Sequence, residues 1–174
     1  MKCRVRYTIV LWVLWLVAGT ELQAQVRSLD EFESDAGWAL IRSDGVNLST
    51  AVEKGHSGNA IRFDYDFTAG TGYGGIQKFF AIDLPENFEF TFYVRAESPA
   101  NNFEIKFLDS TGNNVWWVNN RNFDFPGDWK QIKIRKRHIG FAWGPATDQS
   151  LRRIDRIEFT IASWVGDCDS PVSC

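Results

Sequence analysis

In the stretch Asn59-Ala-Ile-Arg-Phe-Asp-Tyr-Asp-Phe67, apolar and charged side chains alternate from Ile61 to the end. In an extended chain, the apolar residues of this stretch fall on one face and the charged residues on the other. Residues 88–95 and 103–107 alternate in the same way. A period of two is typical of β-strands that have one buried face and one wet face.

We predict short strands along most of the chain and one short helical piece near 148–151. Clusters of Gly, Asp, Ser, Asn and Pro separate the strands, as turns require. Strands at this spacing predict an all-β fold, a jelly-roll β-sandwich. The expected strands are 28–33, 37–42, 47–53, 59–67, 74–82, 87–96, 102–108, 114–119, 129–136 and 155–163.

The first 24 residues have the layout of a secretory signal peptide. A basic start, Met1-Lys-Cys-Arg-Val-Arg6, precedes an apolar run over 9–18 and a small residue, Ala24. The run is about half the roughly 20 residues that span a bilayer, so we expect no membrane attachment after cleavage. The alternative is an uncleaved anchor. We therefore predict a secreted or periplasmic protein with a signal peptide at 1–24, a jelly-roll domain at 25–165 and an irregular tail at 166–174.

The charge balance argues against nucleic acid as a partner. Removing residues 1–24 takes away three basic side chains and one acidic side chain, which changes the net charge from −3 to −5. Nucleic-acid binders normally present a basic surface. The basic run at 133–138 alternates with isoleucines, which indicates a strand with a charged outer face.

Cofactor and zinc signals are weak. Residues 70–75 contain a formal G-x-G-x-x-G, but the strand-like 76–82 follows where a dinucleotide site needs a helix. His56 and His138 are far apart in the sequence and have no neighbouring Cys or His that would complete a zinc site. Cys168 and Cys174 remain after cleavage, and whether they pair is left open.

The most specific local feature is Asn113-Asn-Val-Trp-Trp-Val-Asn-Asn-Arg121. Consecutive Trp116 and Trp117 must point to opposite sides of a sheet. A tryptophan exposed beside amides and Arg121 suits a sugar, because its ring stacks on C–H groups while polar groups bind hydroxyls. The alternative is that both rings are buried.

Acidic side chains on the wet faces also suggest glycoside hydrolysis, which needs two carboxyl groups facing each other across a sugar. Glu89, Glu104 and Glu158 qualify by position, but nothing in the sequence singles out a pair. We therefore expect no enzyme.

Several segments resemble the galactose-binding-domain-like jelly rolls, as found at the N-terminus of bacterial exported proteins that carry discoidin or glycan-active domains. The resemblance covers about residues 28–165 and extends to carbohydrate-binding modules. The segments that carry it are Leu29-Asp-Glu-Phe-Glu33, Gly58-Asn-Ala-Ile-Arg-Phe-Asp-Tyr65, Gly72-Tyr-Gly-Gly75, Asn102-Phe-Glu-Ile-Lys106, Asn114-Val-Trp-Trp117 and Arg153-Ile-Asp-Arg-Ile-Glu-Phe159.

The resemblance implies a structural calcium ion, with candidate ligands Glu31, Glu33, Ser57 and Asn59. It also implies a final strand, and residues 165–174 do not match one. The last strand is therefore expected to be missing or replaced.

Together these observations predict an exported, non-catalytic carbohydrate-binding module, an accessory domain or fragment of a larger polysaccharide-processing protein. Its partners would be a polysaccharide or oligosaccharide and adjacent domains. One alternative is a structural or protein-interaction jelly roll, and another is a small β-sandwich glycoside hydrolase or lyase. The candidate sugar contacts are Trp116, Trp117, Arg121, Tyr93, Arg95 and Glu104.

Overall fold

The computed structural model describes residues 26–69 and 72–163, and its regular structure there is almost entirely β-strand. No helix within these ranges is long and apolar enough to cross a membrane. The strands are β1 (Trp38–Arg42), β2 (Asn47–Lys54), β3 (Asn59–Asp66), β4 (Tyr73–Asp83), β5 (Glu89–Val94), β6 (Asn101–Leu108), β7 (Val115–Phe123), β8 (Lys130–Arg135), β9 (Gly140–Trp143) and β10 (Arg153–Ala162), with a short 3-10 helix η1 (Lys136–His138) after β8.

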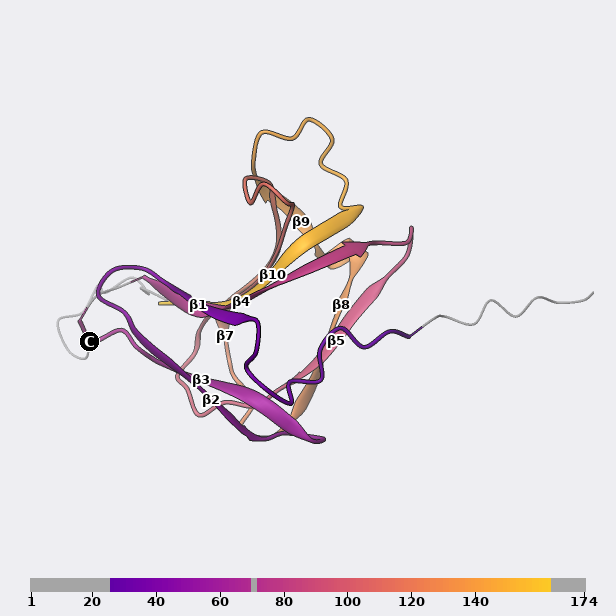
Figure 1. Ribbon diagram of the computed structural model, residues 1–174. Helices are drawn as coiled ribbons and strands as arrows, with labels where there is room; N and C mark the ends of the chain where they lie inside the picture. Colours follow the sequence, from indigo (N-terminus) through magenta and orange to yellow (C-terminus); the bar gives the residue numbers. More distant parts are fainter. Residues whose placement is uncertain (1–25, 70–71, 164–174) are drawn as a thin grey trace, which may run out of the picture.

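Six of the strands form one antiparallel sheet in the order β1-β4-β10-β6-β7-β9. Two separate pairs, β2-β3 and β5-β8, form the opposite layer. In Figure 1 the β2-β3 pair lies below the large sheet on the left, and the β5-β8 pair lies on the right. The prediction of an all-β jelly-roll sandwich is confirmed.

The core lies between the two layers, where the inward side chains of the alternating strands meet. Phe103, Ile105 and Phe107 on β6 are at most 4 % exposed, and Phe90 on β5 stacks on Phe107 with ring centroids 5.0 Å apart. Burying each such side chain stabilises the fold by about 1.5–3 kcal/mol. Phe63 on β3 is only partly buried, because an open cleft separates β3 from the large sheet.

Two expected elements are absent from the structure, and one strand in the structure was not expected. Residues 28–33 are not a strand, since Phe32 has a positive φ of 57° that breaks an extended run. Residues 148–151 are not helical, because the Asp148 carboxylate accepts the backbone N–H of Ser150 in a local turn. A strand that the sequence analysis missed, β9, covers Gly140–Trp143 and pairs with β7. The predicted signal peptide and the tail at 166–174 lie outside the described residues.

Asp30 fastens the segment before β1 to the large sheet. Its carboxylate pairs with Lys78 Nζ at 2.5 Å, accepts the indole N–H of Trp38 at 3.1 Å and accepts the backbone N–H of Phe32 at 2.7 Å. Burial alone would raise the pKa of Asp30, but the hydrogen bonds from Lys78 and Phe32 outweigh it and lower the pKa. The ionised form of Asp30 therefore stabilises the fold.

We expect Asp30→Asn to lower the free energy of unfolding by about 1–3 kcal/mol at pH 7, because it removes a charged hydrogen-bond acceptor. A lowered pKa stabilises the fold above the ordinary pKa of an aspartate, and this contribution is lost as the pH falls through the lowered value. The difference from wild type should therefore shrink in acid. Urea unfolding between pH 3 and 7 measures it. Asp44→Asn is the matched control, since Asp44 is exposed, and an equal loss in both variants would contradict the prediction.

Candidate functional site

The face of the six-stranded sheet that points away from the core carries a dense group of polar and aromatic side chains, which we call the outer face. The strand register places Gln77, Glu158, Lys106 and Trp117 side by side across four strands. The neighbouring row holds Gly75, Thr160, Glu104 and Asn119. All of these positions alternate with core residues, so their side chains lie on one surface.

Two ion pairs occupy the middle of the outer face. Lys106 Nζ lies 2.7 Å from Glu104 Oε2, and Arg156 Nε lies 3.1 Å from Glu158 Oε1. The Thr160 hydroxyl donates to Glu104 Oε2 at 3.3 Å. Glu104 and Glu158 are only 9 % and 8 % exposed, so these carboxylates are held firmly in place.

Burial and the neighbouring charges shift the pKa of Glu158. Burial raises the pKa of Glu158, Arg156 and Lys106 oppose the rise, and the nearby charge of Glu104 adds to it. The net result is a raised pKa. Two acidic groups that lie close together, one of them with a raised pKa, are also the pattern of general-acid sites.

Aromatic rings surround the ion pairs. Tyr73 lies with its ring 5.5 Å from Lys106 Nζ, and the ring of Phe79 lies 5.6 Å from the guanidinium of Arg156. Trp117 packs edge-to-face on Trp143 with centroids 5.5 Å apart. Tyr73, Phe79 and Trp143 are 41 %, 68 % and 49 % exposed. Tyr73 and Trp117 are three strands apart in the sheet and are offset by four residues along the strands, which separates them by about 20 Å.

Gly75 lets β10 lie close to β4 beneath this surface. A Cβ at this position would come within 2.1 Å of the Phe159 carbonyl oxygen and 2.8 Å of Thr160 Cα. The row that contains Gly75 and Thr160 therefore has no large side chain on β4 or β10. Flat rings beside fixed charged groups can stack on the C–H face of a sugar and bind its hydroxyls.

The structure separates the predicted sugar contacts. Trp116 is 6 % exposed in the core and donates its indole N–H to the Gln149 carbonyl at 2.7 Å. Trp117 and Glu104 lie together on the outer face, and the exposed Arg121 follows Trp117 in the same alternation on β7. The prediction that the two tryptophans point to opposite sides of the sheet is confirmed.

Tyr93 and Arg95 lie in the other layer, away from the outer face. Tyr93 stacks on His56 with centroids 3.8 Å apart, and Arg95 lies 5.2 Å over the ring of Trp129. The candidate contacts therefore do not form one site. The residues that the prediction left out are Tyr73, Phe79, Lys106, Trp143, Arg156 and Glu158, and the outward phase of β4, β6 and β10 was the signal that could have identified most of them.

The candidate calcium ligands come together in part. Glu33 Oε1 accepts the backbone N–H of Asn59 at 3.2 Å, and the Asn59 amide donates to the Glu33 carbonyl at 3.4 Å. Glu31 is exposed. Calcium takes six to eight oxygen ligands, and within 26–69 and 72–163 no group of three or more acidic, His or Cys side chains could hold a metal. Calcium binding thus stays a prediction, because the described residues bring too few carboxylates together to complete such a site.

Comparisons with known proteins bear on the fold. No family model matches the chain. The family 11 carbohydrate-binding module of a cellulosomal cellulase of Clostridium thermocellum superimposes with a TM-score of 0.61 and 21 % identity, over 79 % of this chain and 85 % of that one. A family 11 module from the same organism, in complex with a β-1,3-1,4-mixed-linked tetrasaccharide, superimposes with a TM-score of 0.60 and 23 % identity. The superposition covers 78 % of this chain and 85 % of that one. The fold is therefore the jelly roll of such modules.

Endoglucanase H of Acetivibrio thermocellus is a curated relative that is 25 % identical over 151 residues. The match covers 79 % of this chain but only 16 % of the endoglucanase. The chain thus spans about a sixth of the length of the curated relative it matches.

We expect Glu158→Gln and Glu89→Gln to change stability with pH in opposite directions. Because its pKa is raised, Glu158 stabilises the fold below the ordinary pKa of a glutamate, and this stabilisation is lost as the pH rises through the raised value. The free energy of unfolding of Glu158→Gln should therefore increase relative to that of wild type from pH 4 to pH 7. Glu89 is the matched control, because a hydrogen bond from Arg135 lowers its pKa. The free energy of unfolding of Glu89→Gln should decrease relative to that of wild type over the same pH range. Denaturant unfolding at both pH values measures this, and parallel changes would contradict it.

Proposed function

We propose that this chain is an exported, non-catalytic carbohydrate-binding module whose outer face binds a polysaccharide or oligosaccharide. The observation that carries the proposal is the ring of exposed aromatics around two nearly buried ion pairs. The shared fold supports it, since one structural neighbour is a carbohydrate-binding module in complex with a mixed-linked tetrasaccharide.

Each group of the outer face has a distinct part in binding. The rings of Tyr73 and Trp117 stack on the C–H faces of sugar rings, and Trp143 supports Trp117 from its edge. Glu104 and Glu158 accept hydrogen bonds from hydroxyls, while Lys106 donates. The ion pairs already fix these side chains, so little side-chain entropy is lost when a ligand binds.

We also propose that the module works beside a catalytic partner domain. Its curated relative is an endoglucanase that is several times longer than the matched region. The basic and apolar start of the chain supports export to the outside of the cell or to the periplasm. A polysaccharide-processing protein would then use the module to stay close to its substrate.

One observation favours a second candidate function, glycoside hydrolysis. Glu158 has a raised pKa and lies near Glu104, as a general acid and its partner carboxylate would. However, each carboxylate is held by a cation of its own strand, and Glu104 also accepts from Thr160. We expect no release of reducing sugar from mixed-linked β-glucan. Release that disappears in Glu158→Gln would establish the hydrolase.

We expect Trp117→Ala to weaken polysaccharide binding at least tenfold, equivalent to about 1.4 kcal/mol, because it removes a stacking ring. Affinity electrophoresis of residues 25–174 through gels that contain mixed-linked β-glucan, and in parallel other soluble plant polysaccharides, measures the change. Tyr93→Ala is the matched control, since Tyr93 is an exposed aromatic residue in the other layer, and this variant should bind as wild type does.

Other outcomes of the same experiment identify the alternatives. Loss of binding in Tyr93→Ala but not in Trp117→Ala would indicate that the binding site lies in the other layer. A folded wild-type protein that no polysaccharide retards would favour a structural or protein-interaction module. Repeating the gels with calcium and with a chelator tests the predicted metal, because a calcium-dependent shift lost in Glu33→Gln would locate it.

A further inference from the structure

The β5-β8 pair has a wet side that is separate from the outer face of the large sheet. Its inward residues, among them Phe90 and Ile134, belong to the hydrophobic core or pack against it. The residues between them therefore point to solvent. The register pairs these exposed residues as Glu89 with Arg135, Thr91 with Lys133 and Tyr93 with Gln131.

Positive charge gathers at one end of this side. Lys133 and Arg135 lie about 7 Å apart on β8, and Lys136 and Arg137 follow in η1. All four residues are exposed, and we call them the basic strip. Within residues 26–69 and 72–163, Arg135 alone of the four forms an ion pair, with Glu89 at 2.8 Å. The strip therefore carries an excess of positive charge.

Glu89 shows that the strip suits a carboxylate. Its Oε2 accepts a hydrogen bond from Arg135 Nε at 2.8 Å. This bond lowers the pKa of Glu89, and the nearby charge of Lys133 lowers it further. Hydrogen bonds between a guanidinium and a carboxylate are among the strong ones. One carboxylate does not balance four cations, so the strip can attract further carboxylates from a ligand.

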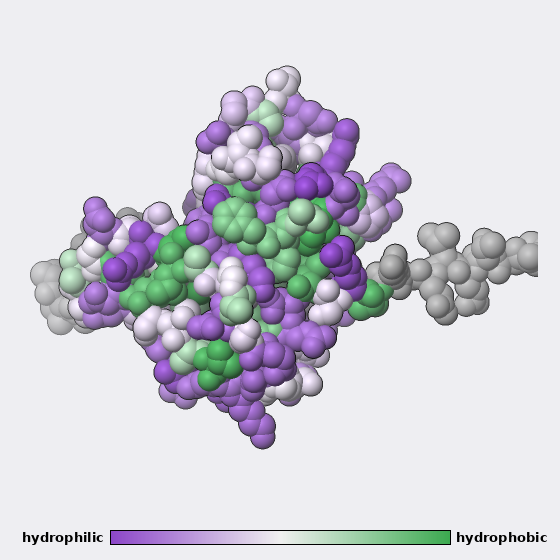
Figure 2. All heavy atoms as spheres, viewed as in Figure 1, coloured by the Kyte–Doolittle hydropathy of each residue, from purple (hydrophilic) through white to green (hydrophobic). Residues whose placement is uncertain are grey.

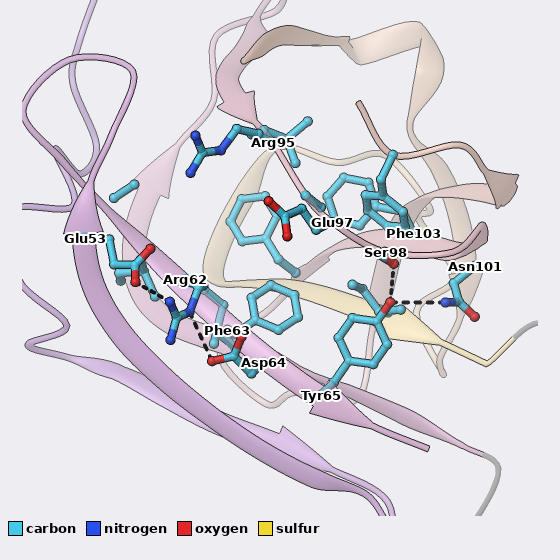
Figure 3. A pocket seen from close by; sticks show the side chains of 18 of the residues that line it. Glu53, Arg62, Phe63, Asp64, Tyr65, Arg95, Glu97, Ser98, Asn101 and Phe103 are labelled. Carbon is cyan, nitrogen blue, oxygen red and sulfur yellow. Dashed lines mark hydrogen bonds and ion pairs between the residues drawn. The ribbon is translucent and has the colours of Figure 1, made fainter. Parts of the chain in front are cut away.

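The other end of the β5-β8 pair carries aromatic rings. Tyr93 is 43 % exposed and stacks on His56, which holds its ring in place. Arg95 lies 5.2 Å over the ring of Trp129, and Figure 3 shows its side chain extended beside the cleft. Tyr93 pairs with a position four residues from Arg135, so about 13 Å separate the two ends. Rings stack on sugars and cations bind carboxylates, so the two ends together fit an acidic sugar chain.

The surroundings of the basic strip disfavour a membrane. Surfaces that lie on membranes combine cations with apolar side chains that insert among the lipids. The exposed neighbours of the strip on β5 and β8 are Glu89, Thr91 and Gln131, which are polar. The apolar cleft of about 1320 Å³ has none of the four strip residues in its lining. Figure 2 shows hydrophobic side chains gathered across the middle of the molecule, between hydrophilic regions.

The overall charge disfavours nucleic acid. The chain carries a formal net charge of −3, so positive charge is confined to a small area. Nucleic acid has a dense and extended negative charge, which the rest of the protein would repel. A polysaccharide with one carboxylate on each sugar has a lower charge density, and its C–H faces can use the aromatic end.

We propose that the wet side of the β5-β8 pair is a second binding site, which takes a polysaccharide with carboxylate groups on its sugars. The basic strip binds the carboxylates, and Tyr93 stacks on a sugar farther along the same chain. The site does not depend on the outer face, because the two lie in different layers. A module with both surfaces can hold a neutral and an acidic polysaccharide at once.

Isothermal titration calorimetry of residues 25–174 with polygalacturonate tests the proposal. The polymer should bind in about 0.05 M NaCl and at least about tenfold more weakly in about 0.5 M NaCl, because salt screens the attraction between exposed charges. Fully methyl-esterified polygalacturonate has the same sugars without the charges, and it should not bind. A chelator in all samples prevents calcium from linking the polymer chains.

Lys133→Glu should weaken the binding of polygalacturonate at least about tenfold, because it replaces an attraction by a repulsion. Arg42→Glu is the matched control. It makes the same change of charge at an exposed position of β1, in the large sheet, and should bind within about twofold of wild type. Trp117→Ala should also keep its affinity for polygalacturonate, which separates this site from the outer face.

Equal binding of the charged and the esterified polymer would overturn the proposal, as would unchanged binding by Lys133→Glu. If Lys133→Glu does not fold by circular dichroism, the exposed Arg137→Glu takes its place. Tighter binding of single-stranded DNA, or of phosphatidylglycerol vesicles, would make the partner another polyanion and the proposal wrong. Binding of mixed-linked β-glucan without polygalacturonate would overturn this proposal alone, and the reverse would overturn only the proposed function of the outer face.

Discussion

The register of β10 between β4 and β6 is the constraint on which both faces of the large sheet depend. Ile157, Phe159 and Ile161 point into the core, while Glu158 and Thr160 point outward between them. A shift of one residue would exchange the two sets and place Glu158 and Thr160 against the phenylalanines of β6. The same hydrogen-bonded pairing thus buries the hydrophobic core and assembles the polar outer face.

The sequence predicts the strands and their faces well, because alternation is a local property. It predicted the separation of Trp116 and Trp117 for this reason. It did not predict which sheet a strand joins, so Tyr93 and Arg95 were grouped with Trp117 although β5 lies in the other layer. The expected strand at 28–33 failed for another reason: the Asp30 carboxylate binds Phe32, Trp38 and Lys78 and holds the segment in an irregular path.

The charged side chains at the centre of the outer face are nearly buried. Lys106 and Arg156 pair with the two nearly buried carboxylates, Glu104 and Glu158, and this attraction offsets part of the cost of burying them. Lys106 also lies near the ring of Tyr73, which ties the aromatic rim to the polar centre. Such coupling explains why the sequence could not predict the site as a unit: its members come from β4, β6, β7, β9 and β10 and meet only through strand order.

The central place of β10 has a consequence for how the protein folds. β4 and β6 do not pair with each other, and β10 joins them. Yet β10 is the last of the described strands to leave the ribosome, about 70 residues after β4. The large sheet therefore cannot close before β10 has been synthesised, and its formation waits on contacts between distant parts of the chain, which makes folding slow. If the chain is exported as we propose, the delay in closing the sheet would keep it unfolded, and so able to thread through a membrane, until β10 has been made.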